Sequence, residues 1–200
     1  MKIGGFQKIS LINYPGKISS CIFTQGCPFR CPFCHNPELV WPYLFAPPLD
    51  EEFIFNFLEK RKHQIEGVVI TGGEPTIHKD LINFIEKIKN KGYFVKLDTN
   101  GTNPSMVKKL VNLRLVDYIA MDVKAPWEKY NILAGTKVNL EVICKSIEII
   151  KNSKIDYEFR TTFVRTFLDE RDILKIKKII GEEKKHKIQE FILPREKVMV

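Results

Sequence analysis

Residues 26–36 read Gly26-Cys27-Pro28-Phe29-Arg30-Cys31-Pro32-Phe33-Cys34-His35-Asn36, with three cysteines in the spacing C-x₃-C-x₂-C. Pro28 and Pro32 lie between the cysteines and disfavour a regular helix there. Three thiols this close in the chain can converge on one inorganic centre. We therefore expect a loop that holds a metal site, with the rest of the chain as its scaffold.

Segments of strand character and of helix character alternate on both sides of this loop. Residues 19–24 lead directly into it, and Val68-Val69-Ile70 is a run typical of a strand buried on both faces. Apolar residues at helical spacing fill the intervening segments. The predicted strands are residues 19–24, 66–71, 93–97, 116–121, 157–164 and 189–193, and the predicted helices are residues 51–63, 79–91, 105–112, 140–152 and 170–181.

Two segments stand outside this alternation. Residues 6–12 alternate apolar and polar side chains before the turn Asn13-Tyr14-Pro15-Gly16, which predicts a leading strand or hairpin arm within residues 1–17. Residues 37–48 are an irregular excursion rich in proline and aromatic residues. The predicted organisation is a single domain, with the arm at 1–17 and the main fold at 18–200.

The predicted fold is α/β, a partial (β/α)6 TIM-type barrel with parallel strands. A complete eightfold barrel takes about 250 residues, more than the 200 present here. A flat doubly wound sheet is the competing architecture. Polar or glycine-rich clusters favour the barrel because they fall at strand carboxyl ends, where barrel enzymes build active sites. These clusters are residues 25–36, 72–75, 98–101, 122–124 and 160–162.

Composition limits the class of protein. A hydrophobic share of 44% and a charged share of 28% are ordinary for a soluble domain. No apolar run approaches the roughly 18 residues of a membrane span, and no signal-peptide pattern opens the chain, so we expect a cytoplasmic protein with no membrane partner. The net charge of +8 comes from lysines scattered over predicted helix faces. Because no basic patch carries interleaved aromatics, we expect no nucleic-acid partner.

The cysteine triplet alone leaves two kinds of metal site open. Three thiolates can bind three irons of a [4Fe-4S] cluster or three positions of a tetrahedral zinc, with His35 as a fourth zinc ligand. A cluster held by three cysteines leaves one iron open to an external ligand. Gly72-Gly73-Glu74 stands at the end of the next strand. The two glycines let a ligand come close to the backbone, and the glutamate carboxylate can accept hydrogen bonds from an ammonium group of that ligand.

These residues resemble the radical S-adenosylmethionine superfamily. The resemblance rests on Cys27, Cys31 and Cys34 after the first strand, with Phe33 before the last cysteine, and on Gly72-Gly73-Glu74 after the second. Asp98-Thr99-Asn100-Gly101 and Asp122-Val123-Lys124 are similar to activating enzymes of glycyl-radical enzymes. Among these the chain most resembles the anaerobic ribonucleoside-triphosphate reductase activating proteins, followed by pyruvate formate-lyase activating enzyme.

The resemblance implies that Cys27, Cys31 and Cys34 ligate a [4Fe-4S] cluster whose open iron binds S-adenosyl-L-methionine. It places Phe33 and His35 near the adenine, and Gly72, Gly73 and Glu74 near the methionine amino group. Asp98, Thr99 and Asp122 match positions that bind a monovalent cation, and Lys124 and Arg160 match positions near the cofactor or the substrate peptide. No residue is expected to act as a general acid or base.

The implied function is generation of a glycyl radical on a partner enzyme, with flavodoxin or ferredoxin as the electron donor. Two alternatives remain open: a radical S-adenosylmethionine enzyme acting on another peptide or a small molecule, and a zinc-stabilised nucleic-acid-binding module. In one respect the chain departs from the related activators. They carry a histidine after the sixth strand, where this chain reads Leu193-Pro194-Arg195-Glu196.

Overall fold

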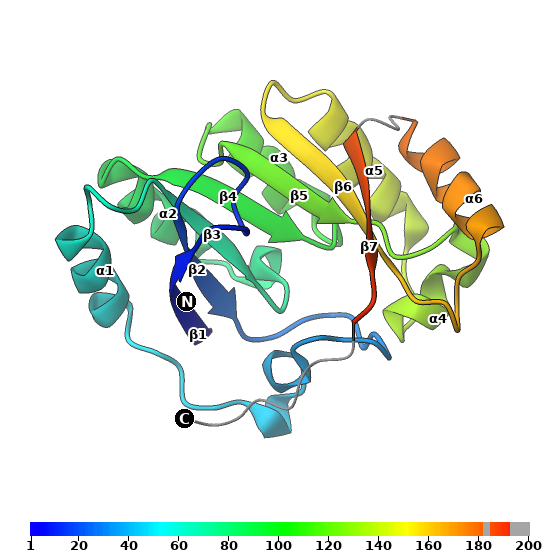
Figure 1. Ribbon diagram of the computed structural model, residues 1–200, viewed down its shortest axis with the longest axis horizontal. Helices are drawn as coiled ribbons and strands as arrows, with labels where there is room; N and C mark the ends of the chain where they lie inside the picture. The colour runs from blue at the N-terminus through cyan, green and yellow to red at the C-terminus, as the bar shows by residue number, and fades with distance from the viewer. Residues whose placement is uncertain (182–184, 193–200) are drawn as a thin grey trace.

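A computed structural model describes residues 1–181 and 185–192 (Figure 1). In this part of the chain, seven strands form one sheet in the order β1-β2-β3-β4-β5-β6-β7. Strands β2 to β7 are parallel, and β1 pairs antiparallel with β2. The strands are β1 (Ile3–Ser10), β2 (Ser19–Thr24), β3 (Gly67–Gly72), β4 (Phe94–Thr99), β5 (Tyr118–Asp122), β6 (Asp156–Phe163) and β7 (His186–Glu190).

Helices cover the outer side of the curved sheet (Figure 1). They are α1 (Glu51–Lys60), α2 (Leu81–Asn90), α3 (Pro104–Asn112), α4 (Tyr130–Ala134), α5 (Leu140–Lys151) and α6 (Glu170–Ile180). The alternation of parallel strands with helices confirms the predicted α/β partial barrel. None of the helices in the described ranges is long and apolar enough to cross a membrane.

Helix ends follow local capping chemistry. The Asp50 side chain accepts a hydrogen bond from the Glu52 amide and starts α1 at the predicted residue. Asp169 and Asp172 form a capping box at the start of α6, and Gly181 ends that helix in the left-handed conformation at φ 70°. These signals explain why the helix predictions agree with the structure to within a few residues.

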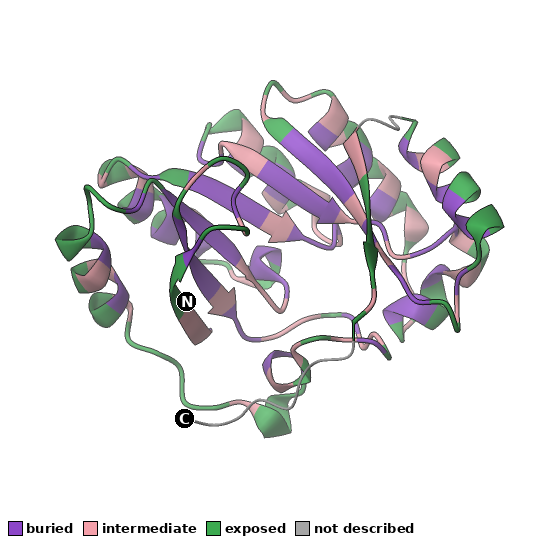
Figure 2. Ribbon diagram, in the orientation of Figure 1, coloured by how far each residue is buried: buried purple, intermediate pink, exposed green. Residues whose placement is uncertain are grey.

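The two faces of the sheet carry different side chains. Along β4, Val95 and Leu97 are fully buried in the apolar core between sheet and helices (Figure 2). Lys96 and Asp98 alternate with them and therefore point to the opposite, concave face. Lys96 is itself 2% exposed. At β4 the concave face is thus charged and the convex face apolar, whereas at β2 and β3 the concave face carries an apolar cluster of Tyr14, Cys21 and Val69.

The structure corrects two sequence predictions. Strand β7 begins at His186 rather than at residue 189, because its pairing with β6 runs from Phe159↔His186 to Phe163↔Glu190. The strand ends at Glu190, although the Phe191 amide still donates to the Phe163 carbonyl at 3.0 Å. Leu193 lies outside the described residues, as do residues 194–200. Helix α4 lies in a segment expected to be a loop, and its five residues are too short for apolar periodicity to reveal it.

The irregular excursion contains two short 3₁₀ helices, η1 (Pro37–Leu39) and η2 (Pro42–Leu44). Proline opens both of them, as suits a first helical position. The excursion returns the chain to α1 from below the inner face of the sheet (Figure 1). It therefore follows the cysteine stretch along the open side of the barrel.

Candidate functional site

A cavity of about 180 Å³ lies at the carboxyl ends of the parallel strands. Residues 26–36, called here the cysteine loop, form one side of it, and the ends of β3, β4, β5 and β6 form the other. This is the common rim that the sequence predicts. The lining residues are Cys27, Phe29, Cys31, Phe33, Cys34, His35, Asn36, Val40, Thr71, Gly72, Gly73, Asp98, Thr99, Asn100, Asp122, Lys124, Arg160 and Thr162.

The cysteine loop contains no regular helix or strand, as its prolines predict. The Gly26 amide donates to the Leu39 carbonyl at 2.7 Å, and the Cys34 amide donates to the Cys31 carbonyl at 3.1 Å. Gly26 has φ 95°, which favours glycine at this turn. The Arg30 guanidinium adds hydrogen bonds to the carbonyls of Cys27 and Phe29 at 2.6 and 2.7 Å, so the loop is held partly by its own side chains and partly by distant segments.

Helix α4 supports the loop from one side. The Arg30 amide donates to the Ala134 carbonyl at 2.7 Å, and the rings of Phe29 and Tyr130 meet edge to face at 6.5 Å. Gly135 has φ 65°, and a Cβ there would lie 1.9 Å from the Arg30 carbonyl oxygen. The loop and the end of α4 are therefore in backbone contact that only glycine allows.

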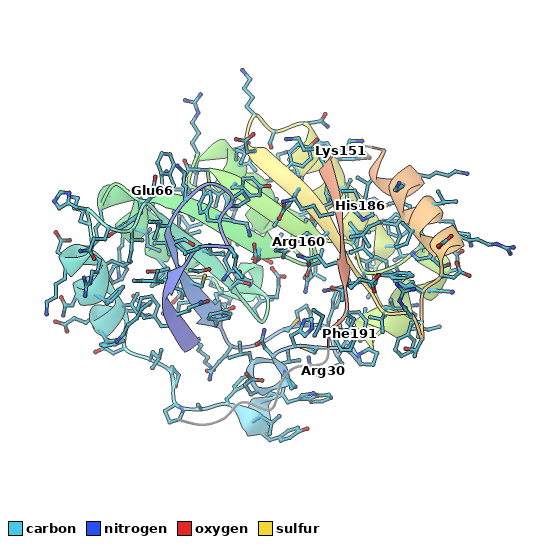
Figure 3. All side chains as sticks on the ribbon, viewed as in Figure 1. Arg30, Glu66, Lys151, Arg160, His186 and Phe191 are labelled. Atoms are coloured by element: carbon cyan, nitrogen blue, oxygen red, sulfur yellow. The ribbon has the colours of Figure 1, made fainter. Side chains whose placement is uncertain are left out.

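The end of β7 supports the loop from the other side, where Figure 3 shows Phe191 close to the loop. The Phe191 ring stacks on His35 at 5.1 Å and meets Phe33 edge to face at 6.1 Å. The Nε2 atom of His35 lies 3.1 Å from the Ile192 carbonyl oxygen. These contacts close the gap between the first and last parallel strands.

The Gly72-Gly73 pair brings the end of β3 against the start of the cysteine loop. The Gly73 amide donates to the Thr24 carbonyl and the Glu74 amide to the Gly26 carbonyl, each at 2.8 Å. A Cβ on Gly73 would lie 2.1 Å from the Gly26 oxygen. The sequence predicts that another group comes close to the backbone at these glycines. In the structure the backbone of the cysteine loop does so.

Glu74 lies behind the cavity wall rather than on it. Its side chain is fully buried, and its Oε1 accepts from the Thr76 amide at 3.1 Å and from the hydroxyls of Thr76 and Thr99. Its Oε2 accepts from the Asn100 amide at 2.6 Å. Burial raises the pKa of Glu74, and these donors oppose the shift. Glu74 thereby fastens the end of β3 to the end of β4.

The three cysteines of the loop are half-buried. Burial raises the pKa of Cys27 to about 12, assisted by the charge of Glu74, and burial also raises the pKa of Cys31. The Asn100 Nδ2 atom donates to the Cys27 sulfur at 3.6 Å. In the described part of the chain, no three His, Cys, Asp or Glu side chains are gathered closely enough to hold a single metal ion.

Five side chains from β4, β5 and β6 form what is called here the charged cluster: Lys96, Asp98, Asp122, Lys124 and Arg160. Lys96 donates to Asp98 Oδ1, and the Arg160 NH1 group donates to Asp98 Oδ2 at 3.3 Å. The Arg160 Nε atom donates to Asp122 Oδ1 at 2.9 Å, and Lys124 donates to Asp122 Oδ2 at 3.0 Å. Figure 3 shows Arg160 near the centre of the concave face.

The charged groups of the cluster shift one another's pKa values. Burial acts to raise the pKa of Asp122, but the charges of Arg160 and Lys124 outweigh it and hold that pKa well below its usual range. Burial likewise acts to lower the pKa values of Lys124 and Arg160, and Asp122 raises both. All three groups are therefore charged at neutral pH.

The cavity brings together twelve of the thirteen residues nominated from the sequence; Glu74 is the exception, since it lies behind the wall. Asn100 was not nominated, although its place inside Asp98-Thr99-Asn100-Gly101 at a strand end could have indicated it. Lys96 was also missed. Its signal is a lysine two residues before Asp98 within an otherwise apolar strand.

Comparison with known proteins gives a consistent family assignment. Residues 21–183 match the model of the radical SAM superfamily. A Methanocaldococcus jannaschii protein named as a glycyl-radical enzyme activating enzyme is 37% identical over 194 residues, covering 94% of this chain and 79% of that protein. The pyruvate formate-lyase-activating enzyme of Listeria monocytogenes is 29% identical over 152 residues, covering 71% of this chain and 60% of the enzyme.

Solved structures share the fold at low sequence identity. The structure described as native anSMEcpe with bound AdoMet matches with a TM-score of 0.65 at 18% identity, covering 88% of this chain and 52% of that chain. TYW1 with a lysine-pyruvate adduct matches with a TM-score of 0.64 at 18% identity, covering 87% and 65%. The chain thus spans between half and two thirds of these two proteins.

Proposed function

Because the chain belongs to the radical SAM superfamily, and within it to the glycyl-radical enzyme activating enzymes, we propose that it generates a glycyl radical on a partner enzyme. We further propose that this partner is an anaerobic ribonucleoside-triphosphate reductase, on the strength of the motif resemblance. The observation that carries the proposal is the shared cavity, where three cysteines meet the glycine-rich end of β3 and the charged cluster.

Cys27, Cys31 and Cys34 are the proposed ligands of a [4Fe-4S] cluster. A tetrahedral zinc draws its ligands to about 2.3 Å from one point, whereas a four-iron cluster takes each thiolate at a separate corner. The match to the radical SAM superfamily supports the cluster over the zinc-stabilised nucleic-acid module.

The remaining lining residues are proposed to bind S-adenosyl-L-methionine, with Phe33 and His35 near its adenine and the Gly72-Gly73 backbone near its amino group. Lys124 and Arg160 supply positive charge for its carboxylate. When bound, the cluster and S-adenosyl-L-methionine supply the chemistry, a one-electron reductive cleavage of the sulfonium and abstraction of a hydrogen atom from a glycine of the partner.

The protein's own contribution is orientation and shielding. The contacts from α4 and β7 fix the cysteine loop, and the strand ends fix the polar groups opposite it. No acid or base is required, and none of the cavity residues is assigned that role. The partner's glycine is proposed to approach over the rim, because the cavity opens at the strand ends.

An external reductant completes the proposal. Flavodoxins and ferredoxins are the proposed donors, and the net charge of +8 suits an acidic protein of this kind. All five cysteines are free in the structure, which suits a reducing compartment, and we propose the cytoplasm. If reduction by an acidic flavodoxin proved insensitive to ionic strength, electrostatic steering would be excluded.

The deciding experiment is anaerobic reconstitution with iron, sulfide, reductant and S-adenosyl-L-methionine, together with a candidate reductase. We expect a glycyl-radical signal by electron paramagnetic resonance that requires every component. Cys31→Ala should abolish both cluster assembly and cofactor cleavage, whereas Cys144→Ala, a cysteine on α5 away from the cavity, should retain both. Retention in Cys31→Ala would sink the cluster assignment. Cofactor cleavage without a radical on any such partner would favour another peptide or a small molecule as substrate.

A further inference from the structure

Lys96 is an unusual residue for its position. It lies within β4, where its neighbours Val95 and Leu97 belong to the apolar core, and its side chain is 2% exposed. Lysine is almost never fully buried unless its charge is paired. Here the ammonium group donates to Asp98 Oδ1 and lies 5.9 Å from the centre of the Tyr118 ring. The buried charge is therefore compensated by specific partners within the concave face.

The carboxylates beside Lys96 have no free oxygen. Asp98 Oδ2 accepts from Arg160, as does Asp122 Oδ1, and Asp122 Oδ2 accepts from Lys124. All four carboxylate oxygens thus have a cationic donor at hydrogen-bond distance. Strand register holds this arrangement, because Asp98 pairs with Ala120 and Asp122 pairs with Arg160 in the sheet.

This arrangement does not fit the monovalent cation that the motif resemblance implies at Asp98 and Asp122. A metal cation binds where the charge of its carboxylate ligands is not already compensated and the surroundings are net negative. Here two carboxylates face three side-chain cations, and the neighbouring carboxylate of Glu158 is paired with Lys187, so one net positive charge remains. A further cation would be repelled, and it would have to displace a buried ion pair.

We infer that Lys96 is the built-in counter-cation of this site, so that the chain binds S-adenosyl-L-methionine without a monovalent metal ion. Lys96 is a positioning residue. It holds Asp98 against Arg160, and the net positive charge of the charged cluster faces the negative carboxylate of the ligand. The ligand in this inference rests on the proposed function, whereas the exclusion of the metal ion does not.

The first measurement needs no ligand. The unfolding temperature of the purified protein is compared in sodium, potassium and tetramethylammonium chloride at equal ionic strength. We expect the same value in all three salts for the wild type, because no metal ion binds the folded state. Lys96→Met removes the charge at similar length and frees Asp98 Oδ1, so potassium or sodium should stabilise that variant relative to tetramethylammonium. Lys96→Arg should behave as the wild type.

The second measurement is equilibrium dialysis of S-adenosyl-L-methionine against the reconstituted protein in the same salts. Wild-type affinity should vary less than twofold, and Lys96→Met should bind about tenfold more tightly in potassium than in tetramethylammonium. The matched control is Lys89→Met, a lysine paired at 2.7 Å with Asp117 away from the cavity, which should stay independent of the salt.

Several outcomes would overturn the inference. Stabilisation of the wild type by sodium or potassium is one, and a salt-independent Lys96→Met is another. If Lys96→Met does not fold, Lys96→Gln, which also removes the charge, is measured in its place, and the wild-type comparison still decides whether a metal ion binds. If the wild type is salt-independent but does not bind S-adenosyl-L-methionine, the proposed function fails and the inference fails with it as far as the ligand is concerned. A salt-independent protein that binds the ligand but activates no partner contradicts the proposed function alone.

Discussion

The cysteine loop and the charged cluster line the same cavity, yet the chain holds them in place by different means. The cluster's side chains sit on adjacent strands, where the pairing of Asp122 with Arg160 sets their separation. The loop has no such ladder. Its shape depends on α4 and on the end of β7, which lie roughly one hundred and one hundred and sixty residues further along the chain.

Substitutions in the two regions should therefore have different effects. A change in the loop's distant supports should displace the thiols while the strand ends keep their geometry. A change in the charged cluster should alter the electrostatics of ligand binding while the loop keeps its shape. Glu74 ties the cysteine loop to the end of β4, because its backbone amide donates to the Gly26 carbonyl and its side chain accepts from Thr99 and Asn100.

The largest expected effect therefore comes from Glu74→Ala. Removing the carboxylate leaves several buried donors without an acceptor, and we expect a loss of about 4 kcal/mol in the free energy of unfolding. Urea denaturation measures it. Glu74→Gln keeps one acceptor oxygen and should cost less than half as much, and Glu59→Ala, at the exposed pair with Lys91, should leave the stability nearly unchanged. A loss below about 1 kcal/mol for Glu74→Ala would show that it does not join the two walls.

Gly135→Ala tests the support that α4 gives to the loop. The added Cβ meets the Arg30 carbonyl at 1.9 Å, and φ is 65°, so both overpacking and backbone strain arise. We expect a loss of about 3 kcal/mol in stability and a fall in iron bound per chain after reconstitution. Both are measurable on one preparation, by urea denaturation and by iron analysis.

Gly92→Ala is the matched control for this variant. It has φ 86° and no heavy atom within 4 Å of its added Cβ, so only the conformational cost of about 1 kcal/mol remains. Its iron content should equal that of the wild type. Equal iron content in Gly135→Ala would mean that the loop holds its shape without α4.

The comparison also explains what the sequence could predict. The charged cluster follows from strand ends: once parallel strands are recognised, Asp98, Asp122 and Arg160 must meet at one rim. The ion pairs that these residues form could not be predicted. In the sequence, Lys96 is simply a residue within a predicted strand, and only the structure shows that it lies on the concave face. The start of α1 was predictable because capping chemistry is local, and Asp50 stands directly before the first residue of that helix.

The supports of the cysteine loop could not be predicted from local pattern. Helix α4 is one turn and a half long, and the contact of Gly135 with Arg30 joins segments about one hundred residues apart. Phe191 falls within the predicted strand 189–193, but its ring contacts with Phe33 and His35 join segments about one hundred and sixty residues apart. Glu74 was expected in contact with the ligand, and its burial depends on donors from two other segments.

Phe191→Ala tests the second support of the loop and should have a smaller effect than Gly135→Ala. It removes the stack on His35 and the edge contact with Phe33, worth about 1.5 kcal/mol together. The expected readout is faster hydrogen exchange of amides in residues 26–36, with unchanged exchange in β4 and β5. Tyr43→Ala, an exposed aromatic in η2, is the control and should change neither. Uniformly faster exchange across the sheet would contradict an independent loop.

The smallest expected effect concerns the charged cluster and its response to pH. The folded-state pKa of Asp122 lies below its ordinary value of 3.8 because Arg160 and Lys124 outweigh burial, so the unfolded chain takes up its proton first as the pH falls. The stability that Asp122 contributes is therefore complete above about pH 5 and is lost as the pH falls below 3.8.

We expect Asp122→Asn to lower the free energy of unfolding by about 1 kcal/mol at pH 7, since solvent still reaches part of the carboxylate. The difference from the wild type should shrink towards pH 3. The cost of Gly135→Ala is steric and should stay constant over that range. Urea denaturation at several pH values measures both variants. If the cost of Asp122→Asn did not change with pH, the carboxylate of Asp122 would not stabilise the fold through its charge.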